Sequence, residues 1–478
     1  MKTIKSIMVF SALLIVACSK DFIEIDPISS ANTAVLYKTD EDFNDAIIGC
    51  YSLLQEQYQN FWEYDLPSDD VRHQWPTEDI RLRLDNYTCQ DNEGLFLDTW
   101  SNYYGVIFRA NTILSNIEEI DASTFVNKDR YIAETKFLRA FAYFDLVRIF
   151  GDVPMITTPL SDEEALQSGR IDIAKIYDEI IIKDLLGAEN KLPEAYSGQN
   201  VGRATKGAAK ALLGKVYLTM KDFVNAEGKL KEVTTMGYAL LPDYNDLFDY
   251  SKDEHHSEYI FDIEYEEGIE EGSGFTNEFS PQEKAVAEFY GVEGGVGNSG
   301  TPSDDLFLIF EPGDLRKDVT VARGFTDKNG VFMAISGSVG AKTFTKKYMT
   351  PVVRGGDSKA NWKVIRYGDV LLMLAEALNE NNKTSEALLE LNEIRNRAGL
   401  EGYTGLTQTE TREKIYLERR LELSFEGHRW FDLVRTGRAF NTLEPLGMKD
   451  YMTLFPIPLD QIQIMNDPAL FPQNPGWD

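Results

Sequence analysis

The sequence is poor in cysteine and histidine, and it has no second long hydrophobic run. It contains three cysteines and four histidines in 478 residues. Three cysteines cannot build a disulfide framework. Cys50 and Cys89 could pair in an oxidising compartment, but the favoured interpretation is that both are buried as small apolar side chains. No segment after the N-terminal one reaches 18 consecutive apolar residues, so we expect no later segment to span a bilayer.

Positive charge is also scarce. Lysine and arginine total 48 against 78 aspartates and glutamates, which gives a net charge of −30. Nucleic acid is therefore excluded as a partner, because its phosphates need basic surfaces. Any attraction to a membrane would have to come from an attached lipid.

Motifs for catalysis, cofactors and metals are missing as well. The sequence has no P-loop, no G-x-S-x-G elbow, no dinucleotide-binding glycine motif and no CxxC pair. The adjacent His255 and His256 in "KDEHHSEY" (252–259) cannot easily face one ion, and a solvated loop is favoured there. We therefore predict no metal site, no cofactor and no catalytic residue. A glycosidase-type acid pair among so many carboxylates stays possible but cannot be placed.

The segment "ERRLELSFEGHRWFDLVR" (418–435) is the most tempting catalytic candidate. Glu418, Glu422 and Glu426 follow one another at a spacing of four, with His428 nearby. Such a group could perform acid–base chemistry. The favoured interpretation is an ion-pair network between these acids and the neighbouring arginines that fixes the last helices to the scaffold.

The N-terminus has the features of an export signal. Two early lysines precede an apolar stretch from Ile7 to Ala17, which stops at Cys18. "Ile15-Val16-Ala17-Cys18" resembles the lipobox of bacterial lipoproteins, in which the cysteine becomes the first residue and carries a diacylglycerol. An ordinary secretion signal with a chance cysteine is the alternative. Lys20 followed by Asp21 resembles the short signal that sends some lipoproteins to the outer face of the outer membrane.

Most of the remaining chain has helical periodicity. Helices are expected at 40–57, 98–120, 128–150, 172–188, 364–380 and 410–436. Helix pairs at 210–233 and 369–400 carry small residues 12 apart, Gly214 with Ala226 and Ala375 with Ala387, which is typical of tetratricopeptide units. The stretch 235–360 is rich in Gly, Asp, Ser and Thr. It predicts a long irregular region with short strands near 259–265 and 343–349.

Six motifs, in order along the chain, resemble the SusD-like (RagB/SusD) family of nutrient-uptake outer-membrane lipoproteins. They are "KFLRAFAYFDLVRIFGDVPM", "IYDEIIIKDLLGAENKLP", "GRATKGAAKALLGKVYL", "VIRYGDVLLMLAEALNE", "ERRLELSFEGHRWFDLVRTG" and "FPIPLDQIQIMNDPALFPQNPGW". The resemblance implies a mainly α fold, with a tetratricopeptide-type scaffold of about four units carrying a long irregular, variable ligand-binding portion. The expected division is a signal peptide at 1–17, scaffold at 18–234, the variable region at 235–360 and scaffold again at 361–478. The resemblance also implies a cell-surface protein, lipid-anchored in the outer membrane, that captures glycans for a SusC-like TonB-dependent transporter.

The candidate binding segment is "YQNFWEYDLPSDDVRHQW" (58–75), which combines aromatic rings with charged groups. Rings cover the apolar faces of sugars, and carboxylates or arginine forks bind their hydroxyls. The candidate residues here are Trp62, Asp69, Asp70, Arg72 and Trp75. The opposing interpretation places some of the aromatics, Tyr58 and Phe61 above all, in the core.

The family likeness adds Tyr290 and Trp362 to the candidate ligand-binding residues. Two or three aromatic platforms at ~2–3 kcal/mol each must offset an association cost of at least ~4 kcal/mol, so we expect micromolar to millimolar affinity. The predicted function is a non-enzymatic, surface-tethered glycan-binding subunit of an uptake complex. The alternatives are a membrane-anchored glycoside hydrolase and a tetratricopeptide scaffold that recognises only protein.

Overall fold

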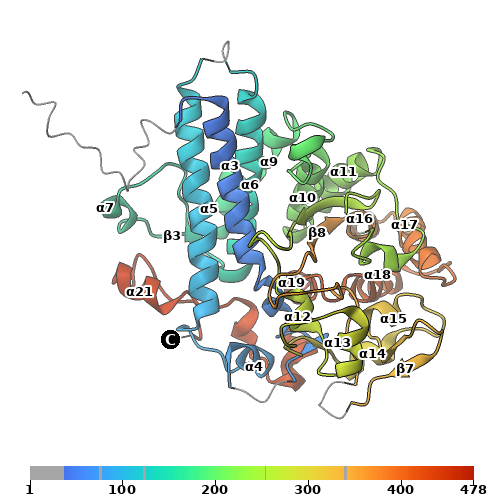
Figure 1. Ribbon diagram of the computed structural model, residues 1–478. Helices are drawn as coiled ribbons and strands as arrows, with labels where there is room; N and C mark the ends of the chain where they lie inside the picture. Colours follow the sequence, from blue (N-terminus) through green and yellow to red (C-terminus); the bar gives the residue numbers. More distant parts are fainter. Residues whose placement is uncertain (1–36, 75–77, 122–124, 253, 338–341, 478) are drawn as a thin grey trace, which may run out of the picture.

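The computed structural model describes residues 37–477, except for 75–77, 122–124, 253 and 338–341 (Figure 1). The expected signal peptide at 1–17, Cys18 and Trp75 therefore lie outside the described residues. The described chain is mainly helical. Its helices are α3 (Asp40–Tyr58), α4 (Ile80–Asp85), α5 (Gly94–Glu118), α6 (Lys128–Phe150), α7 (Asp162–Ala165), α8 (Ile173–Ile176), α9 (Ile182–Glu189), α10 (Lys206–Thr219), α11 (Phe223–Thr234), α12 (Phe275–Phe279), α13 (Lys284–Tyr290), α14 (Asp304–Ile309), α15 (Lys317–Thr320), α16 (Tyr367–Glu380), α17 (Thr384–Arg397), α18 (Gln408–Leu423), α19 (Arg429–Arg435), α20 (Ala439–Leu443) and α21 (Leu459–Met465).

The long helices form a continuous row in which each packs on the next. The contacts run from α3 to α5, α6, α9, α10, α11, α16 and α17 in turn, and α18 packs on both α16 and α17. The long helices α3, α5 and α6 stand side by side in Figure 1. At Gly214 a Cβ would meet the Leu230 side chain at 2.7 Å. The close approach of α10 and α11 expected from the small residues is confirmed.

Several helix ends follow directly from the sequence. Thr39 caps α3 through a reciprocal capping box with Asp42. Helix α6 covers the predicted 128–150 and is followed by Gly151 at φ +75°, a conformation that favours glycine. Gly399 takes the same role after α17, with φ +78°.

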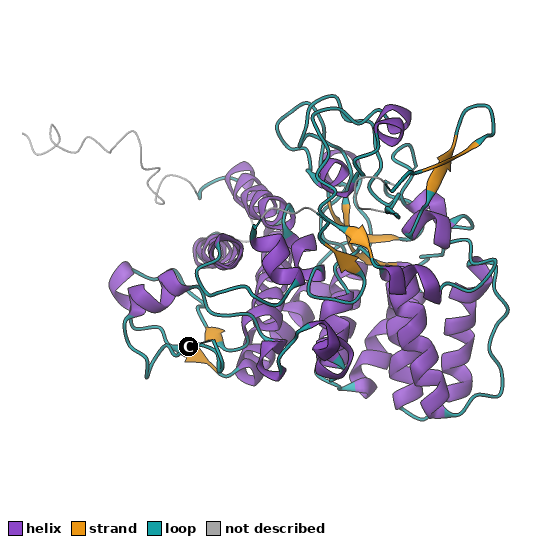
Figure 2. Cartoon of the chain, turned by 90° about the horizontal axis from the view of Figure 1, so that it is seen from below, coloured by secondary structure: helices purple, strands orange, loops and turns teal. Residues whose placement is uncertain are grey.

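Among the described residues the strands are short and form four antiparallel pairs: β1 with β5, β2 with β3, β4 with β8 and β6 with β7. Figure 2 shows them as short arrows between the helices. They are β1 (Val71–Arg72), β2 (Val153–Pro154), β3 (Arg170–Ile171), β4 (Tyr259–Ile263), β5 (Thr301–Pro302), β6 (Gly324–Thr326), β7 (Phe332–Ala334) and β8 (Trp362–Arg366). The pairing of β4 with β8 ties the region 235–360 to the helical scaffold. That region holds long loops and short strands, as its composition predicts, and also the short helices α12, α13, α14 and α15, which were not expected.

Four expectations about local structure need correction. Residues 364–366 belong to β8 and not to the helix that follows, because they pair with β4. The strand expected at 343–349 is reduced to one bridge between Ala322 and Phe344. The helix expected at 172–188 contains a π-helical turn at Tyr177–Ile181. The helix expected at 410–436 is broken between α18 and α19, where Phe425 and Gly427 have φ near +70°.

The acids of the 418–435 segment form a buried ion-pair network, as predicted. Arg366 donates to Glu258, Glu422 and Glu426 at 2.6–2.8 Å. Arg316 and Arg397 add further bonds to Glu422. Because every one of these carboxylates is bound by arginine or lysine, the network fixes α18 against β8 and leaves no free acid for proton transfer.

We predict an acid-labile contribution to stability from Glu426. Burial opposes ionisation of this carboxyl, but Arg366 and Lys347 prevail and lower its pKa to about 2. A carboxyl whose pKa is lower in the folded than in the unfolded chain stabilises the fold above pH ~4.5, and this contribution is lost as the pH falls toward 2. Lys347, whose burial lowers its pKa to about 8, titrates well above this window.

The measurement is urea unfolding of the native chain and of Glu426→Gln at pH 7, 5, 4 and 3. The free-energy difference between the two should shrink with falling pH, by about 2 kcal/mol at pH 3. A difference that is constant from pH 7 to 3 would contradict the prediction.

Candidate functional site

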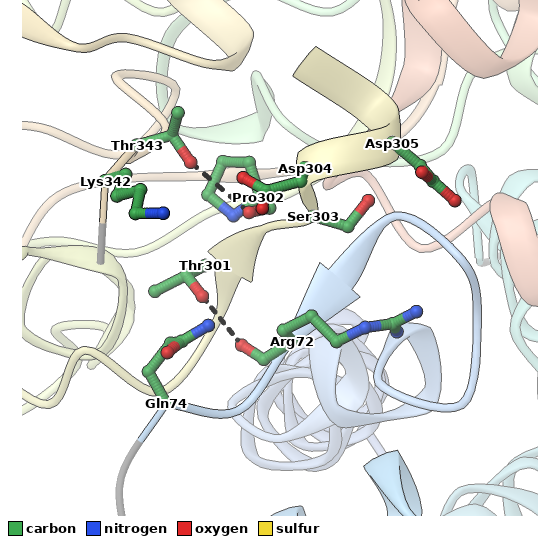
Figure 3. Close-up of a pocket in the computed structure, with 9 residues that line it drawn as sticks. All are labelled: Arg72, Gln74, Thr301, Pro302, Ser303, Asp304, Asp305, Lys342 and Thr343. Carbon is green, nitrogen blue, oxygen red and sulfur yellow. Dashed lines mark hydrogen bonds between the residues drawn. The ribbon is translucent and has the colours of Figure 1, made fainter. Parts of the chain in front are cut away.

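A polar pocket lies where the segment that follows α3 meets the segment that precedes α14. The two segments pair as β1 and β5, with Val71 opposite Pro302 and Arg72 opposite Thr301. The pocket has a volume of about 430 Å³. It is lined by Arg72, Gln74, Thr301, Pro302, Ser303, Asp304, Asp305, Lys342 and Thr343 (Figure 3).

Hydrogen bonds to the main chain hold the two sides of the pocket together. The Thr301 hydroxyl donates to the Arg72 carbonyl at 3.0 Å. Ser303 donates its amide to the Asp70 carbonyl at 2.8 Å and its hydroxyl to the Asp69 carbonyl at 2.6 Å. The same hydroxyl accepts from the Leu306 amide and so caps α14. The pocket is therefore built before any ligand arrives.

Arg72 is oriented by its own loop. Its Nη1 donates to the carbonyls of Ser68 and Val71, each at 2.8 Å, and lies 3.4 Å from Asp85 Oδ1. Burial raises the pKa of Asp85, while bonds from His73 and Arg72 act in the opposite direction. About a quarter of the Arg72 side chain stays exposed, which leaves part of the fork open to the pocket.

The lining can both donate and accept hydrogen bonds. Arg72 and Lys342 supply cations, Asp304 and Asp305 supply exposed carboxylates, and the remaining polar groups are hydroxyls and one amide. Figure 3 shows Gln74 and Lys342 at one end of the pocket and Arg72 and Asp305 at the other. Groups of both kinds on a concave surface suit a ligand rich in hydroxyls. Trp75, a predicted aromatic platform, directly follows the lining residue Gln74.

Arg72 is the predicted residue that the structure places in the pocket, and Asp69 and Asp70 lie beneath it. Arg420 Nε donates to Asp70 Oδ1 at 2.6 Å, and Arg429 makes a two-bond fork to Asp69 at 2.7 and 2.8 Å. Burial opposes ionisation of Asp69, but Arg429 and Arg420 lower its pKa. The side chains of Asp69 and Asp70 anchor the loop to α18 and α19. Only the backbone carbonyls of these two residues contact the pocket, through Ser303.

The structure places two of the three predicted tryptophans, Trp62 and Trp362, in the core. Trp62 and Trp362 are each 1% exposed. Trp62 packs edge-on against Phe279 with ring centroids 5.2 Å apart, and Trp362 stacks on Tyr348 at 5.6 Å. Because other side chains cover their rings, neither offers a face to a ligand in this structure.

Tyr290, at the end of α13, is half-buried against Phe289 with ring centroids 4.9 Å apart. It is not among the residues that line the pocket.

The sequence analysis did not predict the pocket residues that come from the later segment, Thr301 to Asp305. Thr301 and Pro302 close the glycine-rich stretch 291–302, and "SDD" at 303–305 has the pattern of a helix start, with a serine cap and acids in the first turn. That signal locates α14. The pairing with Arg72, more than 200 residues earlier, is a tertiary contact that the sequence does not reveal.

The structure shows the surroundings of Cys50, Cys89 and His255, which are possible metal ligands. Cys50 and Cys89 are both buried and free, so the interpretation of two small apolar side chains is confirmed. His255 is paired with Glu264 at 2.7 Å. Within the described ranges, no group of three or more His, Cys, Asp and Glu side chains is placed to hold a metal ion. The same ranges contain no helix of the length and apolarity needed to cross a membrane.

Comparisons with known proteins agree along the whole chain. Residues 246–477 match the SusD family, and residues 21–218 match a family described as starch-binding and associating with the outer membrane. A SusD-like protein of Formosa agariphila is 30% identical over 522 residues, covering 100% of both chains. A solved laminarin-binding SusD-like protein is 29% identical with a TM-score of 0.81, covering 92% of this chain and 100% of its own. A SusD superfamily structure from Parabacteroides distasonis is 26% identical with a TM-score of 0.76, covering 91% and 99%.

Proposed function

This chain belongs to the SusD family, whose members are non-catalytic glycan-binding proteins associated with the outer membrane, and from this premise we propose that it captures polysaccharide fragments at the cell surface. The pocket at the β1–β5 junction is the proposed glycan site. The observation that carries the proposal is the set of donors and acceptors that converge there from two loops fixed to one another by hydrogen bonds.

The proposed ligand is a neutral glycan of the laminarin type. The solved relative that is 29% identical binds laminarin, which makes this polysaccharide the first to test. The balance of two cations and two carboxylates in the lining also favours an uncharged sugar over a strongly anionic one. Arg72 and the carboxylates would bind hydroxyls, and Trp75 would cover the apolar face of a sugar ring.

The proposed setting is an uptake complex. Cys18 would carry the lipid that tethers the protein to the outer membrane, with the glycan site facing outward. A SusC-like TonB-dependent transporter is the proposed protein partner that receives the glycan. The succession of paired helices α3 with α5, α6 with α9, α10 with α11 and α16 with α17 supports a scaffold of about four tetratricopeptide-type units.

Calorimetry on the protein without residues 1–17, titrated with a panel of polysaccharides that includes laminarin, tests this function. Binding in the micromolar to millimolar range without new reducing ends supports it. New reducing ends in the same samples would instead identify a glycoside hydrolase. Flat titrations together with capture of a transporter from detergent extracts would identify a scaffold that recognises only protein.

We predict that Arg72→Lys weakens binding of the polysaccharide about 5- to 10-fold, because lysine keeps the charge but loses the guanidinium fork, a difference of about 1 kcal/mol. Trp75→Ala should weaken binding as well and leave the melting temperature unchanged. Titration calorimetry and a thermal scan of each variant provide the readout.

Arg412→Lys is the matched control for Arg72. Arg412 is an arginine of similar exposure that pairs with Glu380 on α16, away from the pocket lining. Its replacement should not change affinity. Equal affinities of the native protein and the Arg72 and Trp75 variants would remove both residues from the site.

A further inference from the structure

A second cavity, of about 230 Å³, lies within the helical scaffold. Its walls come from α6, α8, α10, α16, α18 and α19, so the N-terminal and C-terminal parts of the scaffold meet around it. It shares no lining residue with the β1–β5 pocket. A ligand here would therefore bind independently of the proposed glycan.

The body of this cavity is apolar. Hydrophobic side chains from separate elements form most of its wall: Val147, Ile173, Leu218, Met373, Phe431, Val434 and Leu454. A dry apolar cavity of about 150 Å³ is enough to bind benzene, so 230 Å³ accommodates a substituted single ring. The size and lining are unsuited to a hydrated oligosaccharide.

Two polar side chains in the wall have hydrogen-bonding groups without a partner. Tyr177 is 7% exposed, and its hydroxyl makes no hydrogen bond within the described part of the chain. His428 is 6% exposed, and its Nδ1 lies 3.2 Å from the Lys215 ammonium, while its Nε2 has no partner among the described residues. Neither atom belongs to the fully buried polar atoms that lack a partner, so both remain reachable from the cavity and can bond to a ligand there.

The contact with Lys215 determines which ring nitrogen of His428 can donate a hydrogen bond. An ammonium can only donate, so Nδ1 accepts. Burial and the nearby Lys215 lower the pKa of His428 to about 3, so the ring is neutral and its single proton resides on Nε2. The cavity therefore presents an N–H donor from His428 and a hydroxyl from Tyr177, and the matching ligand carries an acceptor oxygen.

The charged side chains of the wall do not call for a charged ligand. Every cation that lines the cavity already has a carboxylate partner. The pairs are Arg148 with Asp145, Lys215 with Asp369, Arg419 with Asp369 and Asp432, and Arg435 with Glu376 and Asp432. Four cations thus face four carboxylates. An added anion would have to give up its hydration without gaining an unpaired cation.

We propose that this cavity binds a small uncharged amphiphile, a single-ring molecule whose acceptor oxygen receives hydrogen bonds from Tyr177 and His428. In this proposal the ring packs on the apolar side chains of the wall, and the oxygen points toward Tyr177 and His428. Tyr177 is also the first residue of the π-helical turn between α8 and α9. Such turns are rare and occur frequently at functional sites.

Three probes of one size separate the contributions: acetophenone has a ring and an acceptor, ethylbenzene has only the ring, and benzoate carries a charge. Ligand-observed NMR titration and a thermal scan on the protein without residues 1–17 supply the readout. We expect acetophenone to bind about 10-fold more tightly than ethylbenzene or benzoate and to raise the melting temperature. No binding of acetophenone, or tighter binding of benzoate, would overturn the proposal.

The variant Tyr177→Phe removes one hydroxyl that has no partner in the fold, so the protein should stay as stable as before. Acetophenone affinity should fall about 5-fold, while ethylbenzene affinity should not change. Tyr104→Phe is the matched control, because the Tyr104 hydroxyl donates to the Pro154 carbonyl and does not line this cavity. Unchanged acetophenone affinity in Tyr177→Phe would show that the probe binds elsewhere.

Discussion

Replacing Arg366 by methionine is expected to lower the free energy of unfolding by about 3–5 kcal/mol, because it removes one partner of several buried charges at once. Arg366 is 1% exposed and bonds to Glu258, Glu422 and Glu426. Methionine has a similar length and would fill much of the space. The loss of unfolding free energy therefore comes mainly from the carboxylates that lose their shared cation, and less from an empty cavity.

Arg412→Met provides the control for this result. Arg412 also makes two bonds to one carboxylate, that of Glu380, but its side chain is 29% exposed. Water can replace its bonds, so the expected loss is below about 1 kcal/mol. Urea unfolding of both variants at pH 7 gives the comparison. Equal losses would mean that the buried network contributes no more than a surface ion pair.

The location of the network also explains why the irregular region keeps its shape. Strand β4 comes from that region, β8 leads into the scaffold, and Arg366 is the last residue of β8. Glu258 precedes β4, while Glu422 lies on α18 and Glu426 just after it. One side chain therefore joins the irregular region, the strand pair and the last scaffold helices. We expect Arg366→Met to lower the free energy of unfolding but to leave the pocket at β1–β5 largely intact. That pocket is held by its own hydrogen bonds to the main chain.

The helices could be predicted because each carries its own signals along the chain. Helix α6 matches the expected 128–150 at both ends, since its apolar residues are dense and Gly151 and Pro154 stop it. The start of α16 differs from the expected residue 364 because a short segment such as 362–366 suits a strand or a helix, and only its pairing with β4 decides.

The site was harder to predict because exposure is a tertiary property. Arg72 was found in a loop whose charges and aromatic rings suggested binding, and the structure places it in the pocket. Trp62 and Trp362 have the same chemistry as a sugar platform, yet both pack inside the core. An aromatic side chain serves either role equally well, and the sequence does not say which neighbours will cover it. Thr301 and Ser303 carried no binding signal because their contribution depends on pairing with a distant strand.

Replacing Cys18 by alanine is expected to abolish the proposed lipid attachment and to release the mature protein from the membrane. The net charge of −30 gives the chain no electrostatic attraction to anionic lipid. Attachment would then depend on acyl chains, each contributing ~0.8 kcal/mol per buried CH₂, with two or three chains needed for a stable anchor. Without them, the predicted partition into the membrane fraction falls by several orders of magnitude.

The measurement is metabolic labelling with an alkyne fatty acid, followed by fractionation and mass spectrometry of the mature N-terminus. Cys89→Ala is the control, because Cys89 is buried and free and has no part in lipid attachment. It should stay labelled and in the membrane fraction. A transporter could retain an unlipidated protein at the membrane, so the label decides the outcome and the fraction alone does not. An unlabelled native protein would contradict the lipid anchor. An unlabelled Cys18→Ala variant that stays membrane-bound after removal of residues 1–17, as read by mass spectrometry, would instead show that a protein partner suffices to hold the chain at the surface.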